Sequence, residues 1–215
     1  DKIYLMGHSW GSFIGIQAAA RAPERFHAYI GVGQLSQQIQ SENIAYQYAL
    51  AQYRADGNDK MLQKLEAAPP SPTAPLPRNY LQIRDLYMHD IGIGTTRDMQ
   101  SVITGIFFPS FQVKELTLRE KINLWRGKIY SRSGEVRLWD EMLTTDLTQK
   151  VPSLEIPAYF LHGKYDYTCA YPLALQYFAL LDAPVKGFYT FDHAAHTPIF
   201  EEPQLALRIM REDVL

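Results

Sequence analysis

The sequence predicts an α/β protein with a mainly parallel sheet that a long helical insertion interrupts. Residues 1–35 and 151–215 alternate short apolar runs with helical patterns, which is typical of a parallel sheet. A glycine-rich turn joins the first apolar run directly to the first helical pattern. The stretch 36–150 is polar and helical in pattern. We therefore expect a core formed by 1–35 and 151–215, and an insertion formed by 36–150.

The first core part has the pattern of one parallel crossover unit. Residues 3–6 predict a buried strand, 12–22 predict a helix that stops at Pro23, and 28–33 predict a second strand. The chain begins directly on that first strand, with neither an initiator Met nor the pattern of a signal peptide. We therefore expect a fragment of a longer protein, and the sequence leaves its localisation open.

The insertion is predicted to be helical on both sides of a proline-rich stretch. Residues 41–65 and 79–142 have helical patterns, and 69–77 predict an extended surface connector. A ligand for a proline-recognition domain is the alternative interpretation of 69–77. Gly92-Ile93-Gly94 lacks the full dinucleotide-binding fingerprint, so it predicts a turn.

The second core part returns to the alternation of strand and helix. Residues 158–161 and 187–191 predict strands, and 173–181 and 201–211 predict helices. Because the strands alternate with helices, we expect them to join the parallel sheet of the first part.

Composition excludes several classes of protein. The chain has 215 residues with 21 basic and 23 acidic side chains, and a net charge of −2, so it lacks the basic surplus of a nucleic-acid binder. Its single cysteine excludes an internal disulfide framework and a cysteine-rich zinc site. No apolar run reaches the length of a membrane-spanning helix.

The turn Gly7-His8-Ser9-Trp10-Gly11 fits the pattern Gly-x-Ser-x-Gly. A predicted strand stands directly before it and a small-residue helix directly after it, which is the context of a nucleophile elbow. Ser9 is therefore the candidate nucleophile, and the backbone N–H of Trp10 is a candidate oxyanion donor. A turn serine between two glycines is the alternative interpretation.

A serine nucleophile needs a base, and the base needs an acid that orients it. Asp166 follows a predicted strand, and His196 follows the next one, in the order that this arrangement requires. His193 is a rival for the base, and Asp192 is a rival for the acid although it follows the wrong strand.

The other candidate groups have structural interpretations. We expect His162 to be hydrogen-bonded near its strand end, His8 to pack and orient the elbow, and Cys169 to be a small buried apolar residue. Three histidines are enough to bind a metal ion, and the chain offers His162, His193 and His196. However, no two of them have the spacing of a helical His-x-x-x-His pair, and no cysteines accompany them as further ligands. We expect no metal and no cofactor.

The chain resembles the α/β-hydrolase superfamily, in particular the relatives of proline iminopeptidase. The resemblance rests on the elbow, on the segment 162–166, and on the ending His-x-Pro-x-x-Glu-x-Pro at 196–203. It implies that Ser9 is the nucleophile, Asp166 the acid and His196 the base, and that 36–150 is the helical cap. It further implies hydrolysis of small esters, amides or N-terminal prolyl peptides by acyl transfer without a cofactor.

The resemblance also implies what the chain lacks. Such enzymes have several further strands before the elbow, and an upstream loop that supplies the second oxyanion donor. Loss of one oxyanion donor typically lowers the rate by roughly 10²–10³. We therefore expect these residues alone to be a weak or inactive catalyst. Without the upstream strands the elbow strand has an exposed edge, so we expect self-association through that edge.

The predicted cap would select the substrate, which is a small molecule or a short peptide. A prolyl aminopeptidase needs cap carboxylates for the substrate ammonium, and Asp85, Asp90, Asp98 and Glu115 are the candidates. A general carboxylesterase is one alternative function, and a catalytically silent binding protein of this fold is another. Relatives that use an aspartate nucleophile are disfavoured by Ser9.

Overall fold

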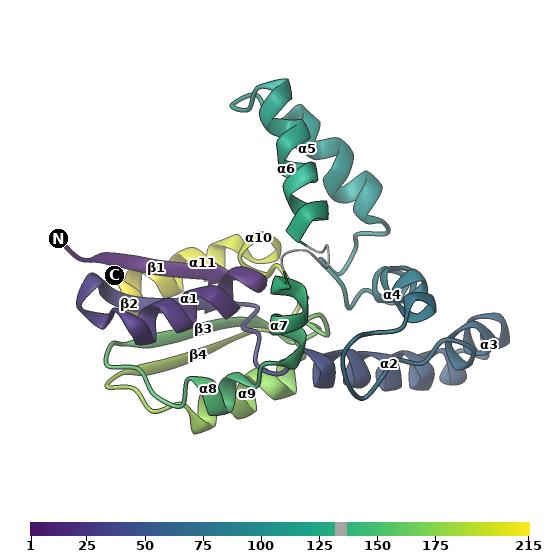
Figure 1. Cartoon of the computed structure of the whole chain (residues 1–215), viewed down its shortest axis with the longest axis horizontal. Coiled ribbons are helices and arrows are strands. Elements are labelled where there is room, and N and C mark those ends of the chain that lie inside the picture. The colour runs from purple at the N-terminus through teal and green to yellow at the C-terminus, as the bar shows by residue number, and fades with distance from the viewer. Residues whose placement is uncertain (132–136) are drawn as a thin grey trace.

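A four-stranded parallel sheet forms the centre of the computed structural model, which describes residues 1–131 and 137–215 (Figure 1). The strands are β1 Ile3–His8, β2 Phe26–Val32, β3 Ala158–Gly163 and β4 Lys186–Phe191. They lie in the order β1-β2-β3-β4, and every neighbouring pair is parallel. The two core parts predicted from the sequence therefore join in one sheet through the β2–β3 pair.

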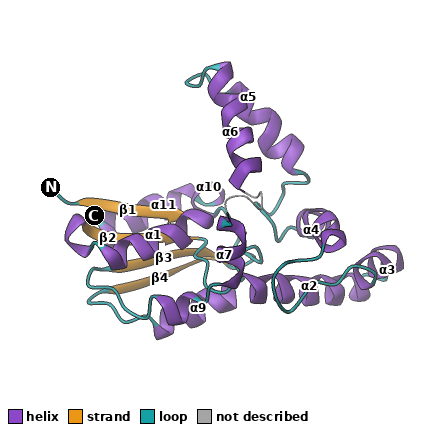
Figure 2. Ribbon diagram, in the orientation of Figure 1, coloured by secondary structure: helices purple, strands orange, loops and turns teal. Residues whose placement is uncertain are grey.

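Helices cover both faces of this sheet (Figure 2). On one face, α1 (Trp10–Arg21) and α9 (Tyr171–Leu180) bury Ile16 and Tyr177 in the larger apolar core. On the other face, α11 (Pro203–Ile209) packs in a second apolar cluster with Ile30 of β2. Because side chains alternate along a strand, the same strands supply both clusters.

The insertion divides into a packed part and a projecting part (Figure 1). Buried residues of α2, α3 and α4 continue the larger core. A helical hairpin of α5 and α6 extends away from it, and Phe107 packs on Trp125 inside this hairpin at 4.9 Å between ring centroids. The other helical segments are η1 Pro23–Arg25, α2 Gln38–Ala55, α3 Asp59–Glu66, α4 Arg78–Asp90, the π-helical η2 Ile103–Phe107, α5 Phe108–Gln112, α6 Leu118–Ser131, α7 Leu138–Thr144, α8 Leu147–Lys150, α10 Pro198–Glu201 and the π-helical η3 Met210–Val214.

Residues 3–6 form a strand as expected, but the expectation that this strand is buried is wrong. Ile3 and Met6 are 59% and 44% exposed. The reason is position in the sheet: among the described residues β1 pairs only with β2, so it is an edge strand.

The expectation of a single closing helix at 201–211 is also wrong. The chain forms α10, breaks at Glu202, and then forms α11 from Pro203 onwards. The break is explained by Pro203, because proline has no N–H to donate and disfavours a helical residue before it.

Two other sequence predictions agree with the structure. Residues 69–77 contain neither helix nor strand, and Gly92 lies in a turn with φ +63°.

In the ranges 1–131 and 137–215, no helix is both long enough and apolar enough to cross a membrane.

Candidate active site

Ser9 lies at the sharp turn between β1 and α1, in a backbone conformation that is rare for a residue with a side chain. Its φ is +57° and its ψ is −122°, and its N–H donates to the carbonyl of Val32 at 3.0 Å. Such strain clusters at functional sites. The turn needs glycine at position 7, because a Cβ there would lie 2.3 Å from the carbonyl oxygen of Gly11. The sequence pattern therefore folds into the strained elbow that it predicted.

The first turn of α1 begins directly after Ser9. Trp10 is the first residue of this helix, so its N–H has no acceptor within the helix. The positive end of the helix dipole also lies here. Both features favour negative charge beside Ser9.

Asp166 and His196 meet in the interior. The Nδ1 of His196 lies 2.9 Å from Oδ2 of Asp166, and both side chains are buried. The backbone N–H of Cys169 donates to Oδ1 of Asp166 at 2.9 Å. Burial alone would raise the pKa of Asp166, but electrostatic attraction to His196 and hydrogen bonds from His162 and His196 hold this pKa below its usual range. Asp166 is therefore an ionised acceptor.

His162 contacts the same carboxylate oxygen, Oδ2, as His196 does. The backbone N–H of Gln34 donates to Nδ1 of His162 at 3.2 Å, so in the neutral ring the proton is on Nε2. That nitrogen lies 3.2 Å from Oδ2 of Asp166 and 2.8 Å from the carbonyl oxygen of Cys169. The expectation of a hydrogen-bonded structural histidine at this strand end is confirmed, but its contact with the acid was not predicted.

His8 links the elbow to the loop that carries His196. Its Nε2 donates to the backbone carbonyl of His196 at 2.8 Å, and the two rings lie 4.8 Å apart. Burial, followed by electrostatic repulsion between the two imidazoles, lowers the pKa of His8, which favours its neutral form. Because His8 directly precedes Ser9, this contact brings the turn of Ser9 beside the loop of His196.

The rival residues lie elsewhere. His193 is exposed, and Asp192 is exposed and paired with Lys164 at 3.2 Å. Cys169 is buried, and burial followed by the charge of Asp166 raises the pKa of its thiol, which disfavours the reactive thiolate. In the described part of the chain, no three His, Cys, Asp or Glu residues are grouped so that they could hold a metal ion.

A cavity of about 420 Å³ opens beside the elbow. Ser9 and Trp10 form part of its wall, and Trp139 contacts Trp10 edge to face at 5.8 Å. Glu42 and Arg84 from the insertion also line it, although the sequence analysis did not single them out. They lie in ordinary amphipathic helical patterns, so no sequence signal marked them.

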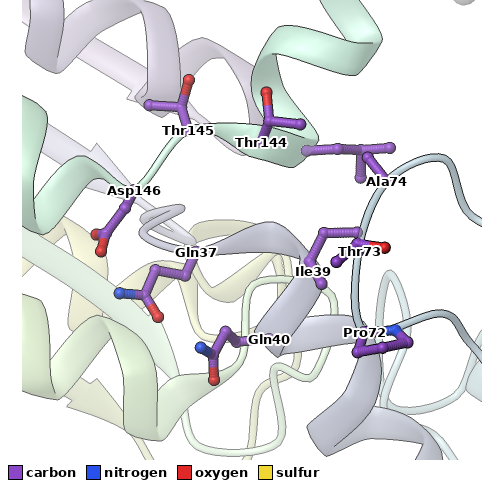
Figure 3. Close-up of a pocket in the computed structure, with 10 residues that line it drawn as sticks. Gln37, Ile39, Gln40, Pro72, Thr73, Ala74, Thr144, Thr145 and Asp146 are labelled. Atoms are coloured by element: carbon purple, nitrogen blue, oxygen red, sulfur yellow. The ribbon is translucent and has the colours of Figure 1, made fainter.

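A separate pocket lies between the start of α2, the proline-rich connector and the segment before α8 (Figure 3). Its volume is about 310 Å³, and Gln37, Thr73 and Asp146 are among its lining residues. Asp146 caps α8 by accepting from the N–H of Thr148. None of the candidate catalytic residues lines this pocket, so the cavity beside Ser9 is the better substrate site.

Comparison with known proteins identifies the family. The profile described as "alpha/beta hydrolase fold" matches residues 1–203. The chain belongs to the α/β-hydrolase family. It is 29% identical over 207 residues to "Probable aminopeptidase YbaC" of Bacillus subtilis (strain 168), and the match covers 95% of this chain and 63% of that protein.

Solved structures agree on the fold of this α/β hydrolase. A proline iminopeptidase from Mycobacterium smegmatis superposes with a TM-score of 0.57 at 14% identity, over 99% of this chain and 64% of the other. An esterase from Exiguobacterium antarcticum superposes with a TM-score of 0.53 at 13% identity, over 99% and 66%. The resemblance and the fold class predicted from the sequence are thus confirmed. The chain spans less than two thirds of the length of each of these three proteins.

Proposed function

We propose that the chain carries the catalytic residues of a serine hydrolase, with Ser9 as nucleophile, His196 as base and Asp166 as acid. The observation that carries this proposal is the buried 2.9 Å contact between His196 and Asp166, beside a strained elbow serine. The proposed substrates are small esters, amides or N-terminal prolyl peptides.

The geometry supports a specific sequence of steps. Asp166 accepts a hydrogen bond from Nδ1–H of His196, which leaves Nε2 without a proton and able to remove the one on the Ser9 hydroxyl. The serine oxygen then attacks the substrate carbonyl carbon, and the N–H of Trp10 with the α1 dipole stabilises the resulting oxyanion. His196 gives the proton to the leaving group, and water hydrolyses the acyl-enzyme by the same route.

The arrangement of the cap carboxylates bears on the choice between peptidase and esterase. Among the four candidates only Asp85 lines the cavity beside Ser9. Asp90 instead accepts from the hydroxyl of Tyr53 at 2.6 Å, and Asp98 accepts from that of Thr96 at 2.8 Å. A panel of aryl esters and proline amides separates the two activities: amide preference that is lost in Asp85→Asn supports a peptidase, and ester-only turnover supports a carboxylesterase.

The proposal is tested by labelling the chain with a fluorophosphonate probe and locating the adduct by mass spectrometry. The chain alone is expected to be a weak catalyst, but labelling needs only a single attack by Ser9. We therefore expect an adduct that forms slowly on Ser9 and disappears in Ser9→Ala and in His196→Ala, because the serine needs its base. His193→Ala is the matched control and should keep the adduct, since His193 is an exposed histidine in the same loop. A folded sample without an adduct on Ser9, or loss of the adduct in His193→Ala, would contradict the proposal.

A further inference from the structure

A buried ion pair forms one wall of the cavity that contains Ser9. The side chain of Glu42 is 1% exposed, and that of Arg84 is 16% exposed. The Nε of Arg84 donates to Oε2 of Glu42, as does the hydroxyl of Tyr80 at 2.7 Å. Gln38 donates to the other oxygen, Oε1, at 2.7 Å. Both oxygens of Glu42 are therefore occupied by protein donors.

The guanidinium of Arg84 has more donors than the protein uses. Arginine carries five N–H groups. One N–H of Arg84 donates to Glu42, and another, on Nη1, donates to Oδ1 of Asp85 at 3.3 Å. Three N–H groups thus have no protein acceptor within the described residues. Because donors out of water are costly to leave unpaired, a ligand acceptor in this cavity would be stabilised by them.

The charges around the cavity favour an anionic partner for these donors. The charge of Glu42 is already balanced by Arg84, and its side chain is 1% exposed, so it is poorly placed to pair with a substrate ammonium. Asp85 is 62% exposed, so solvent screens its charge. Arg78 lines the same cavity as a second cation, with no ion-pair partner in the described part of the chain. A carboxylate matches the planar donor fork of an arginine in charge and in shape.

We propose that Arg84 is a specificity-determining residue that binds a carboxylate of the substrate, so that the enzyme prefers esters or amides that carry a free carboxylate. This inference rests on the proposed function, because it needs Ser9 to be the nucleophile. Glu42 holds the guanidinium in place, and Ser9 attacks the carbonyl that lies elsewhere in the same cavity.

Two pairs of substrates test the preference and locate the carboxylate. The mono-4-nitrophenyl ester of glutaric acid carries it in the acyl part, and 4-acetoxybenzoate carries it in the leaving group. In the neutral partner of each substrate, the free carboxylate is converted to a methyl ester. We expect kcat/KM for one charged substrate to exceed that of its neutral partner by about 10–100-fold, the range for a hydrogen bond to a charged group. Equal rates within both pairs would overturn the inference.

Variants assign the preference to Arg84. Arg84→Lys keeps a cation beside Glu42 but loses the donor fork, and the double variant Arg84→Gln with Glu42→Gln leaves no charge unpaired. We expect both to lower kcat/KM for the charged substrate much more than for its neutral partner, so that most of the preference is lost. Arg54→Gln is the control, because Arg54 is exposed and pairs with Glu66 away from the cavity. An equal fall for charged and neutral substrates would contradict the assignment.

A protection assay keeps the inference testable if the variants do not fold. Glutarate should slow fluorophosphonate labelling of Ser9 in the unmodified chain, whereas 1,5-diaminopentane at the same ionic strength should not. Better protection by the diamine would overturn the inference and favour an ammonium-binding site. Failure of the proposed function is distinct from both results, because Ser9 would then form no adduct at all.

Discussion

Gly163 shows how closely the loops that carry Asp166 and His196 approach each other. It is the last residue of β3, and a Cβ at this position would lie 1.9 Å from the carbonyl oxygen of Ala195 and 2.5 Å from that of Ala194. These carbonyls belong to the loop that carries His196, and Asp166 lies three residues after Gly163 in the sequence. The contact between His196 and Asp166 therefore depends on backbones that pack directly together.

Gly163→Ala should lower the free energy of unfolding by about 1–3 kcal/mol, because the two backbones must move apart. Fluorophosphonate labelling of Ser9 should slow in the folded protein. Gly127→Ala is the matched control: nothing lies within 4 Å of a Cβ there, and alanine in a helix is about 0.5–1 kcal/mol better than glycine. Urea denaturation measures both, and equal stability of the two variants would contradict this account.

At the scale of elements, the loop after α4 contacts both the loop of Asp166 and the loop of His196. Glu201, at the end of α10, accepts from the N–H of Arg97 at 2.7 Å and from that of Ala195 at 2.9 Å. The guanidinium of Arg97 lies 3.7 Å from the ring centroid of Tyr165, next to the acid. The N–H of His196 donates to the carbonyl of Gly94 at 3.2 Å. The insertion therefore helps to hold the core loops in position.

Glu201→Gln should loosen this connection, because its NH₂ group must face one of two backbone donors. We expect faster hydrogen exchange at the amides of Arg97 and Ala195. Glu202→Gln is the matched control and should affect mainly the amide of His193, which donates to Glu202 at 3.0 Å. Unchanged exchange at Arg97 in Glu201→Gln would show that the connection does not depend on this carboxylate.

At the scale of the whole molecule, β1 leaves an apolar sheet edge exposed. Its outer side chains include Ile3, Tyr4 and Met6. The projecting α5–α6 hairpin exposes apolar side chains as well, including Ile129 at 71%. An unpaired strand edge is a template for another strand, because its N–H and C=O groups are already aligned. That the chain alone is a weak catalyst stays a prediction.

We predict that the chain self-associates through β1. Light scattering should give a mass above the 24.6 kDa of one chain, and Met6→Lys should bring the mass down towards that value, because a charge on an edge strand opposes pairing. Ile129→Lys places the same charge on the hairpin and should leave the mass unchanged. The prediction would be contradicted if the unmodified chain had the mass of a monomer, or if Ile129→Lys lowered the mass and Met6→Lys did not.

The sequence by itself determined the parallel α/β fold class and the sharp turn at Ser9, and the division into core parts and an insertion stays a prediction. Those features have local causes: apolar runs, small residues in the first helix, and glycines around a strained turn. The sequence also predicted the positions of Asp166 and His196, since each follows its own strand. The structure brings both into contact, and their catalytic roles remain the proposal made above.

Only the tertiary structure decided which groups surround these residues. The contact of His162 with Asp166, the occupied oxygens of Glu42 and the unused donors of Arg84 join segments that are far apart in the sequence. The exposure of β1 likewise depends on sheet order, because the same apolar run is buried between two strands and exposed at an edge. Local patterns carry no information on such neighbours, since burial and pairing arise from packing.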